Sequence, residues 1–509
     1  MKKIKYYIIL ATLAFGTTSC LDKYPEDAIL ADKAITTVDE ADQAVIGIYS
    51  SFLSGALYSR YLTLLPDIQA DFVYAVNGYT NTYGNIWRWD IQATDTQITS
   101  VYTALYGVIG RCNFLLDNAV KIKQTLTDDD QLDRLDQYCG EAYFARALAY
   151  SELIKLFCKA YESEAEAANE LGIVIRSKYY SDEPTKRASL AESYRFVLDD
   201  LDRAASLLAL EEDYDPSSDG YLYNSTYFNE YTVHALRARV ALYMKDYDAA
   251  IKYSTKVIDS GQYILSSAST AYTSSQSYYQ YMWTSDNSTE IIWKIGYTST
   301  NYGSPTGSIF FNYNYVSFKP DYVPAQWVLD LYAANDLRYS IFFQQYTTGY
   351  SHGLTWPLLV KYWGNTDLYN TTYILNLSMP KVFRLSEQYL IRAEAYAMKE
   401  QPDYNKAGKD ITTLRVARYQ SYGGGTTLTK SNALDVIEEE RVKELYMEGF
   451  RLNDLKRWHK GFTRKQQTET LTNGSTLSIE KENPLFVWPI PQHELEAPGS
   501  EIEPNESNK

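Results

Sequence analysis

The sequence is poor in the side chains that bind metals and form disulfides. It contains only four cysteines and four histidines among 509 residues, with no Cys-x-x-Cys pair and no His-Glu-x-x-His motif. These absences argue against a zinc site and against a small fold held together by disulfides. We expect Cys112, Cys139 and Cys158 to be buried free thiols, with one disulfide as the alternative.

One loop resembles part of a calcium-binding loop. Residues 215–220 place acidic or hydroxyl side chains at positions one, three and five and Gly220 at position six. The twelfth position is Thr226, so the bidentate glutamate that completes such a loop is missing. We therefore favour a turn over a structural calcium ion, and we expect neither a metal nor another cofactor.

Positive charge is also scarce. The chain has 48 Lys and Arg against 64 Asp and Glu, which gives a formal net charge of −16. Proteins that bind nucleic acid draw their affinity from clustered Lys and Arg. The composition therefore argues against nucleic acid as a partner and disfavours binding to an anionic lipid surface.

Long hydrophobic runs are missing, and the clearest short one lies at the start. Residues 6–15 are apolar apart from one threonine, about half of the roughly 20 residues that a membrane-spanning helix needs. Lysines precede this run, and small residues and then Cys20 follow it. This order predicts a removed signal peptide over residues 1–19.

The run Thr18-Ser19-Cys20 resembles the processing site of a bacterial lipoprotein, in which the cysteine becomes the acylated first residue. Acyl chains such as palmitate on Cys20 would anchor the protein to a membrane. We expect residues 20–36 to form an extended tether behind that lipid. The alternative is a cysteine that follows an ordinary secretion signal by coincidence.

Aromatic side chains, in contrast, are abundant, with 49 Tyr, 17 Phe and 9 Trp. A flat ring can stack on the C–H face of a sugar, and planar polar groups can bind its hydroxyls. Residues 66–90 offer both, and if residues 85–90 are extended, two tryptophans lie about 7 Å apart on one face. The candidate glycan-binding residues in this stretch are Trp87, Trp89, Asp67, Asp71, Asn81 and Arg88.

A second aromatic stretch covers residues 278–327, where Tyr279, Trp283 and Tyr313 are further candidates. The alternative for both stretches is that the rings pack an irregular face onto the core, because aromatic side chains supply large apolar surfaces.

Apolar periodicity predicts a mainly helical chain. We expect helices at 37–58, from 99, at 131–158, 189–208, 384–420 and 433–460, and a helical hairpin at 231–259. The Ala-spaced segments 145–157, 236–245 and 391–399 resemble tetratricopeptide units. Residues 59–98 and 262–383 lack a sustained helical period, and there we expect loops and short strands, with a strand at 290–297 and a short helix near 325–334.

Two motifs near the end of the chain are more specific. "VIEEERVKELYMEGFRLNDLKRW" spans residues 436–458, and "WPIPQHEL" spans residues 488–495. With the lipoprotein-like start and the Ala-rich hairpins, they resemble the SusD/RagB family of lipid-anchored outer-membrane proteins. The residues that carry this signature are Glu440, Arg441, Glu444, Glu448, Gly449, Arg451, Asp454, Pro489 and Pro491.

The resemblance implies a mainly α SusD-like fold, in which tetratricopeptide-like hairpins pack against a loop-rich aromatic face with a few short strands. It implies an N-terminal region over residues 37–230 and a C-terminal region over residues 231–509, joined in one compact unit. It also implies a protein of the bacterial outer membrane, facing outward, that captures glycans and delivers them to a SusC-like TonB-dependent transporter.

Two other functions stay open, and a third, an adhesin or surface-layer role, is disfavoured because the sequence has no tandem β modules. A RagB-like protein would bind peptides with the same architecture, and a surface glycoside hydrolase would need two carboxylates about 5–10 Å apart. We favour a protein without catalytic residues, because no nucleophile motif or phosphate-binding loop is present. The charged signature is expected to be structural, since the glutamates one helical turn apart need cations such as Arg441, Arg451 and Arg457 between them.

Overall fold

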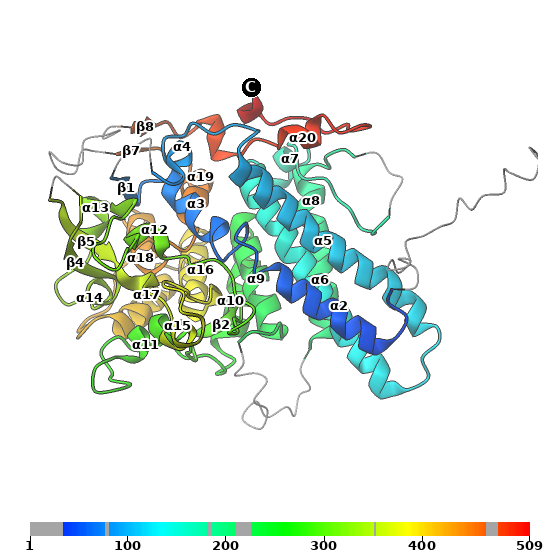
Figure 1. Cartoon of the computed structure of the whole chain (residues 1–509), viewed down its shortest axis with the longest axis horizontal. Coiled ribbons are helices and arrows are strands. Elements are labelled where there is room, and N and C mark those ends of the chain that lie inside the picture. Colours follow the sequence, from blue (N-terminus) through cyan, green and yellow to red (C-terminus); the bar gives the residue numbers. More distant parts are fainter. Residues whose placement is uncertain (1–33, 77–80, 181–184, 210–224, 351–352, 465–476) are drawn as a thin grey trace, which may run out of the picture.

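The computed structural model describes residues 34–76, 81–180, 185–209, 225–350, 353–464 and 477–509, and helices dominate it (Figure 1). The predicted signal peptide, Cys20 and the loop at 215–220 lie outside the described residues. The proposed division at residue 230 stays a prediction. The longer helices are α2 (Val38–Ser51), α5 (Thr96–Lys123), α6 (Asp129–Phe157), α8 (Leu190–Leu207), α9 (Glu230–Tyr243), α10 (Tyr247–Ile258), α16 (Leu385–Met398), α17 (Tyr404–Arg418) and α18 (Ala433–Glu444).

Helices α2, α5, α6 and α8 form a packed layer that confirms the N-terminal helices expected from periodicity (Figure 1). Two of them begin with a capping box, in which Thr37 pairs with Glu40 and Ser189 pairs with Glu192. Each box satisfies backbone N–H groups that the first helical turn leaves without partners. The polar residues before the apolar periods therefore set where these helices start.

The hairpin of α9 and α10 packs against α16, which in turn packs against α17. Alanines line this contact, and Ala238, Ala241, Ala250 and Ala395 share one apolar cluster with Ile391. Small side chains let neighbouring helices approach closely, as in tetratricopeptide repeats. The prediction of Ala-spaced helical hairpins is confirmed.

The remaining part is built from short elements and loops, most of them on the side of the molecule opposite α5 and α6, whereas α7 and α20 lie beside the helical layer (Figure 1). Four antiparallel strand pairs hold it together: β1 (Val73–Ala75) with β3 (Tyr322–Pro324), β2 (Ile291–Lys294) with β6 (Lys381–Arg384), β4 (Phe343–Thr347) with β5 (Thr355–Leu359), and β7 (Phe462–Arg464) with β8 (Leu477–Ile479). The short helices are α3 (Tyr61–Gln69), α4 (Gly84–Trp87), α7 (Glu164–Ala167), α11 (Tyr278–Ser285), α12 (Ser308–Phe311), α13 (Gln326–Leu329), α14 (Arg338–Phe342), α15 (Thr366–Thr372), α19 (Arg451–Arg457), α20 (Gln492–Leu495), η3 (Val360–Tyr362), η4 (Pro484–Phe486) and η5 (Glu506–Asn508).

Helix α3 departs from the prediction of loops and short strands over residues 59–98. It contains Pro66, and nearly every side chain along it is buried. A helix that is buried all round has no polar face, so it leaves no amphipathic period in the sequence. The expected strand at 290–297 and the short helix near 325–334 are present as β2 and α13.

The signature segment is not one helix, as the pattern over residues 433–460 had suggested. Helix α18 ends at Glu444 and α19 begins at Arg451, with Gly449 between them at a φ of +84°. A Cβ atom on Gly449 would lie 2.1 Å from the carbonyl oxygen of Leu62. Only glycine fits this close approach, and the turn redirects the chain.

The end of the chain returns to the helical layer. Trp488 is fully buried, its backbone N–H donates to the Leu156 carbonyl over 2.9 Å, and its indole donates to Gln69 over 2.8 Å. The Asn508 side chain pairs with both backbone polar groups of Ile490. Pro489 and Pro491 thus lie in a fixed, extended segment.

The three cysteines within the described residues are free and buried, as expected. Burial raises the pKa of the Cys139 thiol to about 11. None of the helices in the described ranges is both long enough and apolar enough to cross a membrane.

Candidate functional site

The signature glutamates lie at the centre of a buried ionic network. Glu444 accepts hydrogen bonds from the guanidinium groups of Arg384 and Arg418 over 2.8 Å and from Arg338 over 3.1 Å. Glu440 pairs with Arg338 and Arg415, and Glu448 pairs with Arg384 and Lys361. The network joins α18 to η3, α14, β6 and α17.

The electrostatics of this network do not suit proton transfer. Burial alone would raise the pKa of Glu444, but the guanidinium groups of Arg418 and Arg384 hold it well below its usual range. At Glu440, burial also raises the pKa, but the guanidinium group of Arg338 lowers it more, and the pKa falls to about 2. A general acid at neutral pH needs a raised pKa, so these carboxylates serve as structural anions.

The cations in the network are not the ones that the sequence suggested. Arg441 and Arg457 both pair with Asp454 over 2.9 Å, and Arg451 pairs with Asp71 and Glu438. Helix spacing identified a charged network but not its partners, since they come from segments far away in the sequence.

Two predicted sugar-binding acids also hold the signature in place. Asp67 on α3 is fully buried and accepts the backbone N–H groups of Gly449 and Arg451 over 3.0 and 2.8 Å. Asp71 accepts hydrogen bonds from Nε and Nη2 of Arg451 over 2.8 and 2.9 Å. These acids are committed to the turn between α18 and α19 and do not reach the surface.

The proposed tryptophan platform at residues 85–90 is wrong, because the segment is not extended. Trp87 ends helix α4, and Trp89 has a φ of +62°, so the two indoles enter different apolar clusters. Trp87 is fully buried, donates to the Val73 carbonyl and lies under Arg464 at 4.4 Å. Trp89 is buried and donates to the Gln69 carbonyl over 2.6 Å.

The other candidates of the first stretch do not form a surface site either. The Asn81 side chain is buried and donates to the backbone carbonyl of Asp321, and Arg88 is half-buried. The packing alternative is thus correct for the candidates Asp67, Asp71, Asn81, Trp87 and Trp89, which are all buried.

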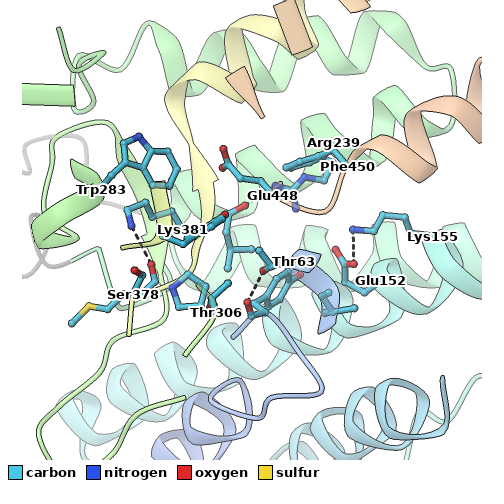
Figure 2. A pocket seen from close by; sticks show the side chains of 16 residues that line it. Thr63, Glu152, Lys155, Arg239, Trp283, Thr306, Ser378, Lys381, Glu448 and Phe450 are labelled. Atoms are coloured by element: carbon cyan, nitrogen blue, oxygen red, sulfur yellow. Dashed lines mark hydrogen bonds and ion pairs between the residues drawn. The ribbon is translucent and has the colours of Figure 1, made fainter. Parts of the chain in front are cut away.

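In the second stretch, Tyr279 and Trp283 are buried. Tyr279 donates to Glu444 over 3.2 Å and lies under the Arg418 guanidinium. Trp283 faces Lys361 and Lys381 at the edge of an internal cavity (Figure 2). That cavity has a volume of about 30 Å³, room for about two water molecules and not for a sugar ring.

Tyr313 is the one predicted candidate with a ring on the surface, and it belongs to a larger group. We name this group the aromatic patch, and its members are Tyr313, Tyr315, Phe318, Tyr346 and Trp363. Tyr315 is 69% exposed, Trp363 is 45% exposed and Tyr313 is 37% exposed. Exposed rings in contact with one another form a surface suited to stacking on a flat apolar face.

The rings of the patch are ordered against one another. Tyr313 stacks on Phe318 with centroids 4.6 Å apart, and Phe318 lies 4.8 Å from Tyr346. The rings of Tyr346 and Trp363 are 13° from parallel with centroids 6.4 Å apart. Of this pair, Trp363 is exposed and Tyr346 is half-buried, so Trp363 is the ring that a ligand can reach most easily.

Backbone hydrogen bonds support the loop that carries the patch. Lys319 donates to the Phe311 carbonyl, which closes the loop at its base, and Gly349 donates to the Phe318 carbonyl from the tip of the β4–β5 hairpin. Polar side chains accompany the rings: the Tyr346 hydroxyl donates to Gln344, and Asn312, next to Tyr313 in the chain, donates to Asp321. The segments that carry the patch thus supply amide groups as well as rings.

Sequence reasoning missed Phe318, Tyr346 and Trp363 as site residues. They come from a loop, strand β4 and the end of η3, and only tertiary packing brings them together. The available signal was local, namely the dense "YNYVSF" run at residues 313–318 within the second aromatic stretch.

Comparison with known proteins agrees with this architecture. The SusD family model matches residues 343–500, and a second model, described as starch-binding and associating with the outer membrane, matches residues 21–242. A SusD superfamily protein from Bacteroides thetaiotaomicron has a similar structure, with a TM-score of 0.75, 24% identity, and coverage of 92% of this chain and 99% of that one. The surface glycan-binding protein A of Bacteroides fluxus has a TM-score of 0.67 and 20% identity, and the match covers 93% of this chain and all of that one.

SusD-like protein P2 of Formosa agariphila is 24% identical over 158 residues, which are 31% of this chain and 30% of that protein. The match therefore spans less than a third of this relative's length. The folds agree over nearly the whole chain, and the two family models match both ends of it. This chain belongs to the SusD/RagB family, which includes starch-binding proteins that associate with the outer membrane.

Proposed function

We propose that this chain binds a glycan on the aromatic patch and performs no chemistry on it. The observation that carries the proposal is the 45% exposed ring of Trp363, nearly parallel to the half-buried ring of Tyr346, whose hydroxyl donates to the Gln344 amide. A pyranose ring has an apolar face that stacks on such rings and hydroxyls that pair with planar polar groups. The description of the second family model as starch-binding supports a glycan over a peptide.

The site offers no support for catalysis. The carboxylates at the centre of the signature are buried and paired with arginines, and the pKa values of Glu440 and Glu444 are lowered. In the described part of the chain, no group of three or more His, Cys, Asp or Glu side chains is placed to hold a metal ion. Binding a glycan requires only the exposed rings and polar groups of the aromatic patch, whereas catalysis would also require an acid or a nucleophile.

The binding experiment compares the wild-type chain with Trp363→Ala and Tyr346→Ala on a panel of starch, other plant and algal polysaccharides, and peptides. We expect one class of polysaccharide to bind and each variant to lose at least about tenfold in affinity, about 1.4 kcal/mol. Tyr180→Ala is the matched control, because Tyr180 is 74% exposed and lies outside the patch. Binding of peptides alone, or variants that bind like wild type, would overturn the proposal, and release of sugars from the polysaccharide would refute the non-catalytic role.

The second part of the proposal is that a lipid on Cys20 holds the protein in the outer membrane, facing outward, where it delivers the glycan to a SusC-like TonB-dependent transporter. The support is the lipoprotein-like start of the sequence and membership in a family with outer-membrane association. We expect Cys20→Ala to release the protein from the membrane fraction and to reduce glycan uptake. A released variant that still supports full uptake would count against the anchored role.

A further inference from the structure

A second group of exposed rings lies outside the aromatic patch. We name it the tyrosine triad, and it consists of Tyr272, Tyr278 and Tyr281. The rings of Tyr272 and Tyr281 stack with centroids 3.9 Å apart and an angle of 29°, and Tyr278 meets Tyr272 edge-on at 5.3 Å. Tyr272 and Tyr278 are each 46% exposed.

The loop that carries the triad is closed by its own backbone. Tyr272 donates to the Gln276 carbonyl over 2.8 Å, Tyr278 donates to the Thr270 carbonyl over 3.1 Å, and Ala271 and Ser277 form a β-bridge. The N-terminus of α11 continues this loop, with Ser277 as its cap. The rings are therefore presented from a defined turn.

The chemistry around the triad favours a neutral, hydroxyl-rich ligand. Residues 266–285 contain no Asp, Glu, Lys, Arg or His, although 22% of the whole chain is Asp, Glu, Lys or Arg. Exposed hydroxyl side chains lie between Tyr272 and Tyr278 in the sequence, at Thr273, Ser274 and Ser275. Within this segment no charged side chain is present to pair with an ionic headgroup or a charged peptide, whereas rings and hydroxyls both suit a sugar.

The triad and the aromatic patch arise from elements that pack on each other. Helix α11 carries Tyr278 and Tyr281 and packs against η3. Trp283 of α11 meets Tyr362 of η3 with ring centroids 6.2 Å apart, and Trp363 of the patch is the next residue. The triad and the patch are therefore carried by elements in direct contact.

We propose that the tyrosine triad is a second glycan subsite, which engages the same polysaccharide chain as the aromatic patch. This inference rests on the proposed function. Two subsites on one chain make the second contact intramolecular, so affinity rises with ligand length beyond what either subsite provides. The protein would therefore select long chains over short oligosaccharides.

The test uses the polysaccharide of the panel that binds wild type most tightly and the tetrasaccharide released from it. We expect Tyr272→Ala/Tyr278→Ala to lower affinity for the polysaccharide at least about tenfold and to leave affinity for the tetrasaccharide unchanged. Tyr179→Ala/Tyr180→Ala is the matched control, since these two exposed tyrosines also contact each other and lie outside both ring groups. We expect the control to bind both ligands like wild type.

The outcomes distinguish failure of the second subsite from failure of the proposed glycan-binding function. If Trp363→Ala loses both ligands while the triad variant binds the polysaccharide like wild type, the function stands and the second subsite is refuted. If the triad variant instead changes a dimer into a monomer with no change in glycan binding, the triad is a contact between copies and the inference is also refuted. If Trp363→Ala has no effect on either ligand, the proposed function itself fails.

Discussion

Both the buried ionic network and the aromatic patch contain aromatic side chains, but in the network these side chains bind other protein groups, whereas in the patch they are exposed to solvent. In the network, Tyr279 lies under Arg418 and donates to Glu444, so its ring and its hydroxyl are both occupied by the protein. In the patch, Trp363 contacts other rings and is still 45% exposed to solvent. The difference teaches that an aromatic residue is available for a ligand only where the fold leaves one face without a partner.

The largest effect is expected where the network is broken. Glu444→Ala removes a fully buried carboxylate and leaves Arg338, Arg384 and Arg418 short of a counterion. Breaking a buried ion pair from one side costs about 3–5 kcal/mol, and three cations place this site toward the upper end. Chemical denaturation followed by circular dichroism measures the change in the free energy of unfolding.

Asp435→Ala is the control for that variant on the same helix. Its carboxylate is 81% exposed and lies 3.9 Å from the Lys460 ammonium group, so we expect a loss under about 1 kcal/mol. Equal losses from the two variants would contradict the contrast between a buried network and surface charge. An activity that Glu444→Ala abolished without loss of stability would make the network catalytic.

The next largest effect is the contrast between the buried Trp87 and the exposed Trp363. Trp87→Ala opens a cavity beneath Arg464 and removes the bond to the Val73 carbonyl, and we expect a loss of about 3–5 kcal/mol in stability. At a temperature where this variant is still folded, glycan binding stays within about twofold of wild type. Trp363→Ala has the opposite profile, with stability changed by about 0.5 kcal/mol or less and weaker binding. If folded Trp87→Ala lost glycan binding, residues 66–90 would return as the ligand site.

Much of the helical architecture was predictable because its signals are local. Thr37 with Glu40 and Ser189 with Glu192 mark helix starts, and alanines at helical spacing mark the packed hairpins. The site was less predictable, since Phe318, Tyr346 and Trp363 become neighbours only through the strand pair β4–β5 and the loops that it supports. Trp87 and Trp89 were misplaced because the segment expected to be extended is helix α4 up to Trp87 and then has a positive φ at Trp89.

The contact between Asp67 and the turn at Gly449 has a consequence for how the protein folds. Asp67 and Gly449 are separated by 382 positions in the chain. The paired residues of β1 and β3 are separated by about 250 positions. These contacts close large loops before they gain any stabilisation, which slows the final step of folding. The core around α3 therefore cannot close until the signature turn has been synthesised, so a chain that lacks residues beyond 448 would collapse without reaching the native state.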